Sequence, residues 1–114
     1  MNTQGELYEQ LAADYLAAQG LQLVSRNFQC KAGEIDLIMR QGQYWVFVEV
    51  KYRASNAYGG ALAAVTRSKQ LKVIRAVQLY RQLHRLGDQP CRIDVLAIEG
   101  RGPYQYNWLT NAFS

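Results

Sequence analysis

The sequence has little of what builds a disulfide framework or a zinc site. Its 114 residues include only two cysteines, Cys30 and Cys91, and one histidine, His84. These three side chains are scattered along the chain, so a structural zinc site is not expected. Spacing alone leaves a disulfide open, but two free thiols better suit a reducing compartment.

Long apolar runs, internal repeats, low-complexity tracts and interdomain linkers are also missing. The longest apolar stretches have the length of a strand, which is too short to span a membrane. The N-terminus lacks the basic and apolar regions of a signal peptide. We therefore expect one domain over residues 1–114, located in the cytoplasm and without a membrane partner.

Charge is present but unevenly distributed. The net charge is +4, with six of the nine acidic residues in the first 49 positions and seven of the thirteen basic ones between Arg67 and Arg92. This asymmetry predicts a carboxylate cluster beside a basic surface, where a cation and a polyanion would meet. A solvated basic helix face is the alternative, and charge alone does not decide between the two.

Two helices are predicted from the hydrophobic periodicity. The first follows a capping box at Thr3-x-x-Glu6 and ends at Gly20, and the second runs from about Thr66 to Leu86 and ends at Gly87. Their predicted buried stripes are Leu7, Leu11, Tyr15 and Leu16 in the first helix, and Leu71, Ile74, Val77 or Tyr80, and Leu83 in the second.

Five strands are predicted around these helices, in the order helix, three strands, helix, two strands. This order is typical of one sheet with helices packed on it. A loop containing Tyr58-Gly59-Gly60 precedes the second helix. The predicted strands are 21–28, 35–40, 44–51, 91–98 and 104–109.

The second and third strands are predicted to form a hairpin with a type II′ turn at Gly42-Gln43. This register pairs residues whose numbers sum to 85, which places Asp36 opposite Glu49 and Glu34 opposite Lys51. Glu49 and Lys51 share a face because strand side chains alternate with a period of two. The predicted apolar face opposite them consists of Val46, Val48, Val50, Ile35, Leu37 and Met39.

Asp36, Glu49 and Lys51 are charged residues within otherwise apolar strands. Burying a charge costs several kcal/mol unless the charge is paired or binds a metal. Two carboxylates at one point of a sheet could bind Mg²⁺ or Mn²⁺, which prefer oxygen ligands. Lys51 could then orient a water or neutralise charge that develops on a phosphate. A cross-strand salt bridge on a solvated face is the structural alternative.

The segments Gly33–Ile38 and Val46–Lys51 resemble the core motif of the PD-(D/E)xK nuclease superfamily. Over nearly its full length the chain resembles more closely the YraN-like family, a group of uncharacterised small bacterial proteins. The other features that carry this resemblance are Gly5-x-x-x-Glu9, Arg26-Asn27, Lys69, Arg92-Ile93-Asp94-Val95 and Asn111-Ala112-Phe113.

The resemblance implies an α/β, restriction-endonuclease-like fold, a central mixed β-sheet flanked by helices in the order α-β-β-β-α-β-β. It also implies that Asp36 and Glu49 are metal ligands and catalytic acids, that Lys51 is the catalytic lysine, and that Glu9 is an additional catalytic and metal-binding acid. The family usually has glycine at the position of Tyr8, which predicts crowding beside Glu9. Without the resemblance, Glu9 would be interpreted as an exposed helical glutamate.

The activity that the resemblance implies is Mg²⁺- or Mn²⁺-dependent hydrolysis of phosphodiester bonds in DNA, including branched or Holliday-junction-like DNA. RNA stays open as a substrate. A homodimer is expected if the substrate is a two-fold symmetric junction. The alternative is a non-catalytic nucleic-acid-binding protein with the same fold.

Basic and aromatic residues near the motif are candidates for nucleic-acid contacts. The predicted phosphate contacts are Arg53, Arg67, Lys69, Lys72 and Arg75. For the helical members of this set, helical spacing alone slightly favours solubility as the explanation. Tyr52 and Tyr58 flank the candidate site and could stack on bases, although most tyrosines of the chain are better assigned to core edges.

Two further acids receive structural predictions. Glu34 is expected to pair with Lys51. Asp94, within an apolar strand, is expected to pair with Arg92 or a helix terminus.

Overall fold

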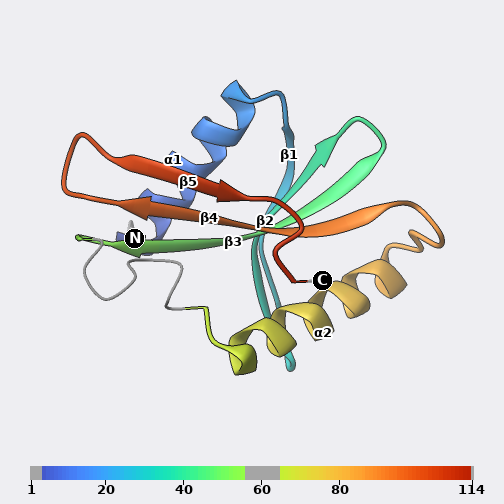
Figure 1. Cartoon of the computed structure of the whole chain (residues 1–114). Helices are drawn as coiled ribbons and strands as arrows, with labels where there is room; N and C mark the ends of the chain where they lie inside the picture. Colours follow the sequence, from blue (N-terminus) through green and yellow to red (C-terminus); the bar gives the residue numbers. More distant parts are fainter. Residues whose placement is uncertain (1–3, 56–64, 114) are drawn as a thin grey trace.

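A computed structural model describes residues 4–55 and 65–113, which form one mixed five-stranded sheet and two helices (Figure 1). The predicted α/β class and the order α-β-β-β-α-β-β are confirmed. Thr3 of the capping box and the Tyr58-Gly59-Gly60 loop lie outside the described residues. The elements are α1 (Gln4–Ala18), β1 (Gln22–Cys30), β2 (Gly33–Gln41), β3 (Tyr44–Arg53), α2 (Arg67–Leu83), β4 (Cys91–Glu99) and β5 (Gln105–Leu109).

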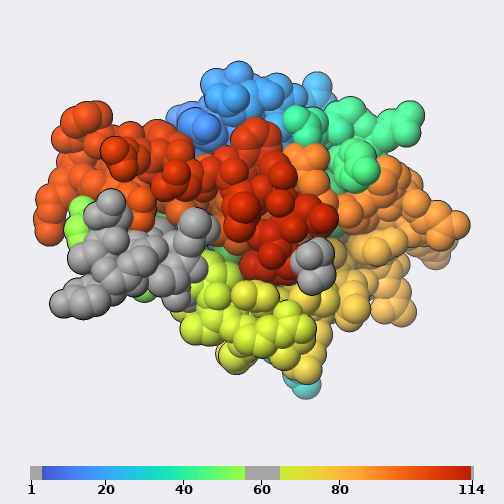
Figure 2. All heavy atoms as spheres, in the orientation of Figure 1, coloured from blue at the N-terminus to red at the C-terminus, as the bar shows by residue number. Residues whose placement is uncertain are grey.

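The sheet has the strand order β1-β2-β3-β4-β5, and only β3 and β4 pair in parallel. A parallel pair needs a long crossover, and α2 lies in the connection between β3 and β4. The two helices cover opposite faces of the sheet (Figure 1), and in the space-filling view α1 (blue) and α2 (yellow) lie on opposite sides of the strands (Figure 2). No described helix is both long and apolar enough to cross a membrane.

Two hydrophobic clusters, one on each face of the sheet, hold the helices in place. On the α1 face, Leu16 packs with Val46 and Val48 of β3, and on the α2 face, Tyr80 packs with Phe47. Consecutive β3 residues therefore enter opposite clusters, as the period of two requires. β3 is the middle strand of the sheet, and its side chains are buried on both faces.

The β2–β3 hairpin has the predicted register from Leu37↔Val48 to Gln41↔Tyr44. Its turn contains Gly42, with φ of 58°. The predicted apolar face is confirmed except at Ile35, which packs in the α2-face cluster instead of with Leu37 on the α1 face. Strict alternation fails because β2 separates from β3 at Asp36, where the strand pairing ends.

The predicted buried stripes of the helices are partly wrong. Leu7 is 43% exposed and Leu83 is 61% exposed, and Leu71 is also exposed. The helices instead bury small residues beside a few large ones, because small side chains let a helix lie close to a sheet. The buried positions are Tyr8, Ala12, Ala13 and Leu16 in α1, and Val73, Ala76, Val77 and Tyr80 in α2.

Asp94 joins three segments near the C-terminus of the chain. Its side chain is fully buried and accepts hydrogen bonds from Arg92 Nε, at 3.1 Å to each carboxylate oxygen. It also accepts from Trp108 Nε1 at 3.0 Å and from the Asn111 backbone at 2.9 Å. The predicted pairing with Arg92 is confirmed, and the carboxylate connects β5 and the following residues to β4 through hydrogen bonds.

Cys30 and Cys91 are free thiols.

Candidate metal and nucleic-acid site

The central strand β3 places Glu49 and Lys51 on the α2 face of the sheet. Both follow Phe47 at intervals of two, so they continue the face that packs against α2. Lys51 Nζ lies 3.0 Å from Glu49 Oε1, and the two side chains are only 18% and 10% exposed. Lys51 therefore pairs with Glu49, and the predicted pairing with Glu34 is wrong.

Asp36 lies where β2 and β3 separate. The strand pairing stops at Leu37↔Val48, one position short of the predicted Asp36↔Glu49 pair. Instead, the backbone N–H of Val50 donates to Asp36 Oδ2 at 2.8 Å. The carboxylate thus satisfies a β3 donor beyond the last strand pair, which directs the Asp36 side chain toward β3.

The two carboxylates are buried without enough positive charge to balance them. Counted as whole residues, Asp36 is 7% exposed and Glu49 is 8% exposed. Burial, together with the charge of Glu49, raises the pKa of Asp36 to about 8. Burial also raises the pKa of Glu49, although Lys51 opposes that change. A divalent cation would supply the missing positive charge.

A cavity of about 310 Å³ opens between β3 and the first turns of α2. Lys69 and Lys72 reach it from the helix and face Glu49 and Lys51 on the sheet. The charge of Lys69 acts on the pKa of Glu49, after the larger effects of burial, Lys51 and Glu34. The lining residues are Gly33, Glu34, Glu49, Lys51, Lys69, Lys72 and Val73.

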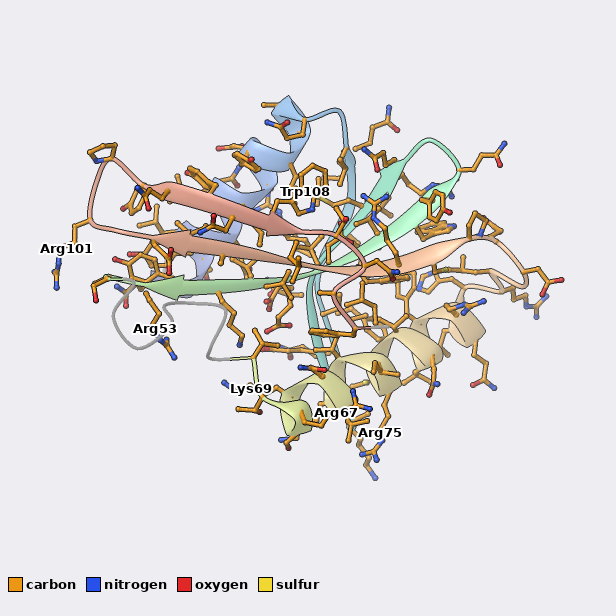
Figure 3. All side chains as sticks on the ribbon, viewed as in Figure 1. Arg53, Arg67, Lys69, Arg75, Arg101 and Trp108 are labelled. Atoms are coloured by element: carbon orange, nitrogen blue, oxygen red, sulfur yellow. The ribbon has the colours of Figure 1, made fainter. Side chains whose placement is uncertain are left out.

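The other predicted phosphate contacts do not line this cavity. Arg53 lies at the end of β3, and Figure 3 shows that it extends on the same side of the sheet as Lys69. Arg67 and Arg75 lie on the exposed part of α2. Of the five predicted phosphate contacts, only Lys69 and Lys72 line the cavity, and the three arginines are exposed elsewhere on β3 and α2.

Glu9 is separated from this cavity and lies on α1. It lines a second cavity, of about 420 Å³, together with Arg26 and Asn27 of β1. Burial raises the pKa of Glu9, and a hydrogen bond with the Asn27 side chain opposes this change. Tyr8, which stands where the family usually has glycine, is buried and stacks on Tyr52 with ring centroids 3.7 Å apart.

The donor set suits a hard cation held by few protein ligands. Among residues 4–55 and 65–113, no group of three acidic, histidine or cysteine side chains is placed to hold a metal ion. Asp36 and Glu49 supply carboxylate oxygens, and Mg²⁺ commonly keeps several waters and one or two carboxylates. Glu9 acts electrostatically on Asp36, after burial, Glu49 and the Val50 hydrogen bond.

Two features of the site were missed by sequence reasoning. The Val50 N–H is a backbone donor and leaves no sequence signal. The second is Gly33, where an added Cβ would lie 3.1 Å from both the Cβ and the carbonyl oxygen of Lys72. Gly33 therefore lets β2 lie close to α2, which sets the width of the cavity.

Comparison with known proteins places these residues in a family. Residues 8–98 match the sequence pattern of the Uncharacterised protein family UPF0102, the YraN family. The chain belongs to this family. Its similarity to the YraN-like family is thereby confirmed, and the matched region contains the cavity and both buried carboxylates.

Individual UPF0102 proteins are similar over almost their whole length. One from Shewanella loihica is 51% identical over 111 residues, covering 97% of this chain and 94% of the relative. One from Aeromonas hydrophila is 50% identical over 113 residues, covering 97% and 85%. One from Legionella pneumophila is 47% identical over 110 residues, covering 96% and 92%.

The raised pKa of Asp36 predicts that metal-free protein loses stability as pH rises. Below pH 3.8 the carboxyl is protonated in both states, whereas between 3.8 and about 8 the folded state binds more protons than the unfolded state. The free energy of unfolding should therefore fall through this window. In Asp36→Asn the fall should be smaller, because the amide does not titrate, and its oxygen can still accept the hydrogen bond from Val50. Each kcal/mol by which Asp36→Asn is more stable than the unmodified protein at pH 8 should raise its Tm by about 4 °C.

Thermal melts from pH 5 to 9 in a chelator test this expectation, with Asp14→Asn as the control for an exposed acid. Some fall should persist in Asp36→Asn, because the pKa values of Glu9 and Glu49 are raised as well. Equal pH dependence in Asp36→Asn and the unmodified protein would refute the account of the buried carboxylate.

Gly33→Ala should disturb the cavity through direct crowding. Its Cβ would press on the Lys72 backbone and displace α2, at a cost of about 1–3 kcal/mol. Gly87→Ala is the matched control, since Gly87 has φ of 58° and open space around it. Both variants should lower Tm in thermal melts, but only Gly33→Ala should also weaken the hydrogen-exchange protection of the α2 backbone around Lys72. Unchanged protection of that part of α2 in Gly33→Ala would contradict the positioning role.

Proposed function

We propose that this protein is a nuclease of the restriction-endonuclease-like fold that hydrolyses phosphodiester bonds in DNA with Mg²⁺ or Mn²⁺. The observation that carries the proposal is the pair of buried carboxylates, Asp36 and Glu49, whose charge is insufficiently balanced. The pair lies beside Lys51 and, through Glu49, at the wall of a cavity with lysines. A purely structural salt bridge would need one acid for Lys51, and the single hydrogen bond from Val50 does not offset the cost of burying Asp36 as a second charge.

Asp36 and Glu49 would hold the cation. Glu9 lines a separate cavity and would act on this site through its charge, which acts on Asp36. A divalent ion bound there would polarise a phosphoryl oxygen and make water easier to deprotonate. Lys51 has its ammonium group 3.0 Å from a Glu49 oxygen, so it lies next to the position where the phosphate would react. From there it can stabilise negative charge that develops on the phosphate oxygens.

Lys69 and Lys72 suit the binding of the phosphate backbone. Both line the cavity, on the wall that faces Glu49 and Lys51. Arg53, Arg67 and Arg75 add exposed positive charge around it (Figure 3). A cavity that combines carboxylates with lysines suits a metal ion and a polyanion together, as opposed to either one alone.

The substrate that best suits this proposal is DNA, including branched or Holliday-junction-like forms. This preference rests on the sequence motif Gly5-x-x-x-Glu9, which resembles that of junction resolvases of the superfamily. A homodimer would match two scissile strands related by two-fold symmetry.

The second candidate function is non-catalytic nucleic-acid binding with the same fold. Two observations favour it. Within residues 4–55 and 65–113, no three acidic, histidine or cysteine side chains are placed to hold a metal ion together. The Lys51–Glu49 ion pair also partly neutralises the site. Under this alternative, DNA binding depends on the lysines and arginines and needs no metal.

Glu49→Ala and Lys51→Ala should abolish metal-dependent cleavage while leaving DNA binding largely intact. Removing a group that stabilises transition-state charge lowers the rate by about 10²–10³-fold. The assay incubates purified protein with Mg²⁺ or Mn²⁺ and linear, flapped and four-way DNA. Lys31→Ala, which removes an exposed lysine outside the cavity, is the control. No cleavage of any substrate by protein that binds DNA well would favour the binding module.

Mg²⁺ or Mn²⁺ should raise the Tm of the unmodified protein through preferential binding to the folded state. At a concentration of 100 Kd the stabilisation is about 2.7 kcal/mol. Asp36→Asn and Glu49→Gln should lose this shift, whereas Asp14→Asn should keep it. A shift that survives in both site variants would show that the cation binds elsewhere.

A further inference from the structure

Two exposed arginines lie together at one end of the sheet. Arg53 is the last residue of β3, and Arg101 lies in the turn between β4 and β5. Since β3 and β4 pair in parallel up to Arg53↔Glu99, the turn that follows Glu99 is adjacent to Arg53. Figure 3 shows both side chains at this end of the molecule.

The turn that carries Arg101 is attached to β3 by two hydrogen bonds. The backbone N–H of Gly100 donates to the carbonyl oxygen of Arg53 at 3.1 Å. The Tyr52 hydroxyl donates to the carbonyl oxygen of Gly100 at 2.6 Å. On the other side of the turn, Tyr104 packs edge-on against Tyr52. The backbone at Arg101 is thus held in place before any ligand binds, which reduces the entropic cost of binding.

Neither arginine is neutralised by an acidic side chain of residues 4–55 or 65–113. The guanidinium of Arg53 donates to the Tyr52 carbonyl oxygen, and the described ion pairs are those of Lys51 and Arg92. Glu99 is the nearby acid, but it is 9% exposed and accepts a hydrogen bond from the Asn107 side chain at 3.2 Å. Two exposed guanidinium groups are well suited to phosphate, which they can bind through paired N–H donors.

We propose that Arg101 and Arg53 form a second phosphate-contact surface, along which the nucleic-acid backbone continues beyond the cavity. The inference rests on the proposed function only in that the ligand is nucleic acid, and it requires no cleavage. Lys69 and Lys72 contact the backbone at the cavity, and the two arginines contact it at the ends of β3 and β4. Tight binding therefore needs DNA that extends past the acids toward the β4–β5 turn.

Salt-dependent DNA binding by Arg101→Gln tests this surface. Fluorescence anisotropy with a labelled duplex over a KCl series should show weaker binding and a log–log slope shallower by about 0.9, the value for one lost phosphate contact. The control is Arg85→Gln, which removes an exposed arginine just after α2. The C-terminal end of α2 lies at the opposite end of the molecule from the β4–β5 turn (Figure 1). Its affinity and slope should be unchanged.

Binding to DNA of increasing length distinguishes the contribution of this surface to affinity from that of the cavity. Lengthening the DNA should increase affinity less for Arg101→Gln than for the unmodified protein, whereas Lys69→Gln should weaken binding at every length. An unchanged slope and length dependence in Arg101→Gln, with Lys69→Gln impaired, would overturn the second surface and leave the proposed function standing. Failure of the unmodified protein to bind any DNA would overturn both.

Discussion

Burial of Asp36 and Glu49 within the sheet is the constraint on which the site depends. Both residues are less than a tenth exposed, in strands whose neighbouring side chains fill two hydrophobic clusters. One ion pair from Lys51 and one backbone hydrogen bond from Val50 stabilise them. Two buried acids next to a single close cation are costly in a protein that has no other use for them.

The sheet topology brings basic side chains close to the buried carboxylates. Because β3 and β4 are parallel, the chain must cross over between them, and the crossover contains α2. That helix brings Lys69 and Lys72 over the face that carries Glu49. The same parallel pairing places the β4–β5 turn, with Arg101, beside the end of β3. One topological feature therefore arranges the lysines of the cavity and the arginines beyond it.

Most of the fold could be predicted because it depends on local patterns. The element order, the hairpin register from Leu37 to Gln41 and the shared face of Glu49 and Lys51 follow from periodicity and turn chemistry. The buried helix faces could not be predicted as well. Leucine-rich stripes were favoured by hydrophobicity, whereas close packing on a sheet selected alanines such as Ala12 and Ala76.

The sequence by itself determined that Asp36, Glu49 and Lys51 are charges within apolar strands, because side-chain alternation is a local property of the chain. It also determined membership of the UPF0102 family. Only the tertiary structure decided that Lys51 pairs with Glu49, that Asp36 accepts from Val50, and that Glu9 lines a different cavity. These outcomes depend on where β2 separates from β3 and on which face each helix covers, and such long-range geometry is set by packing of the whole core.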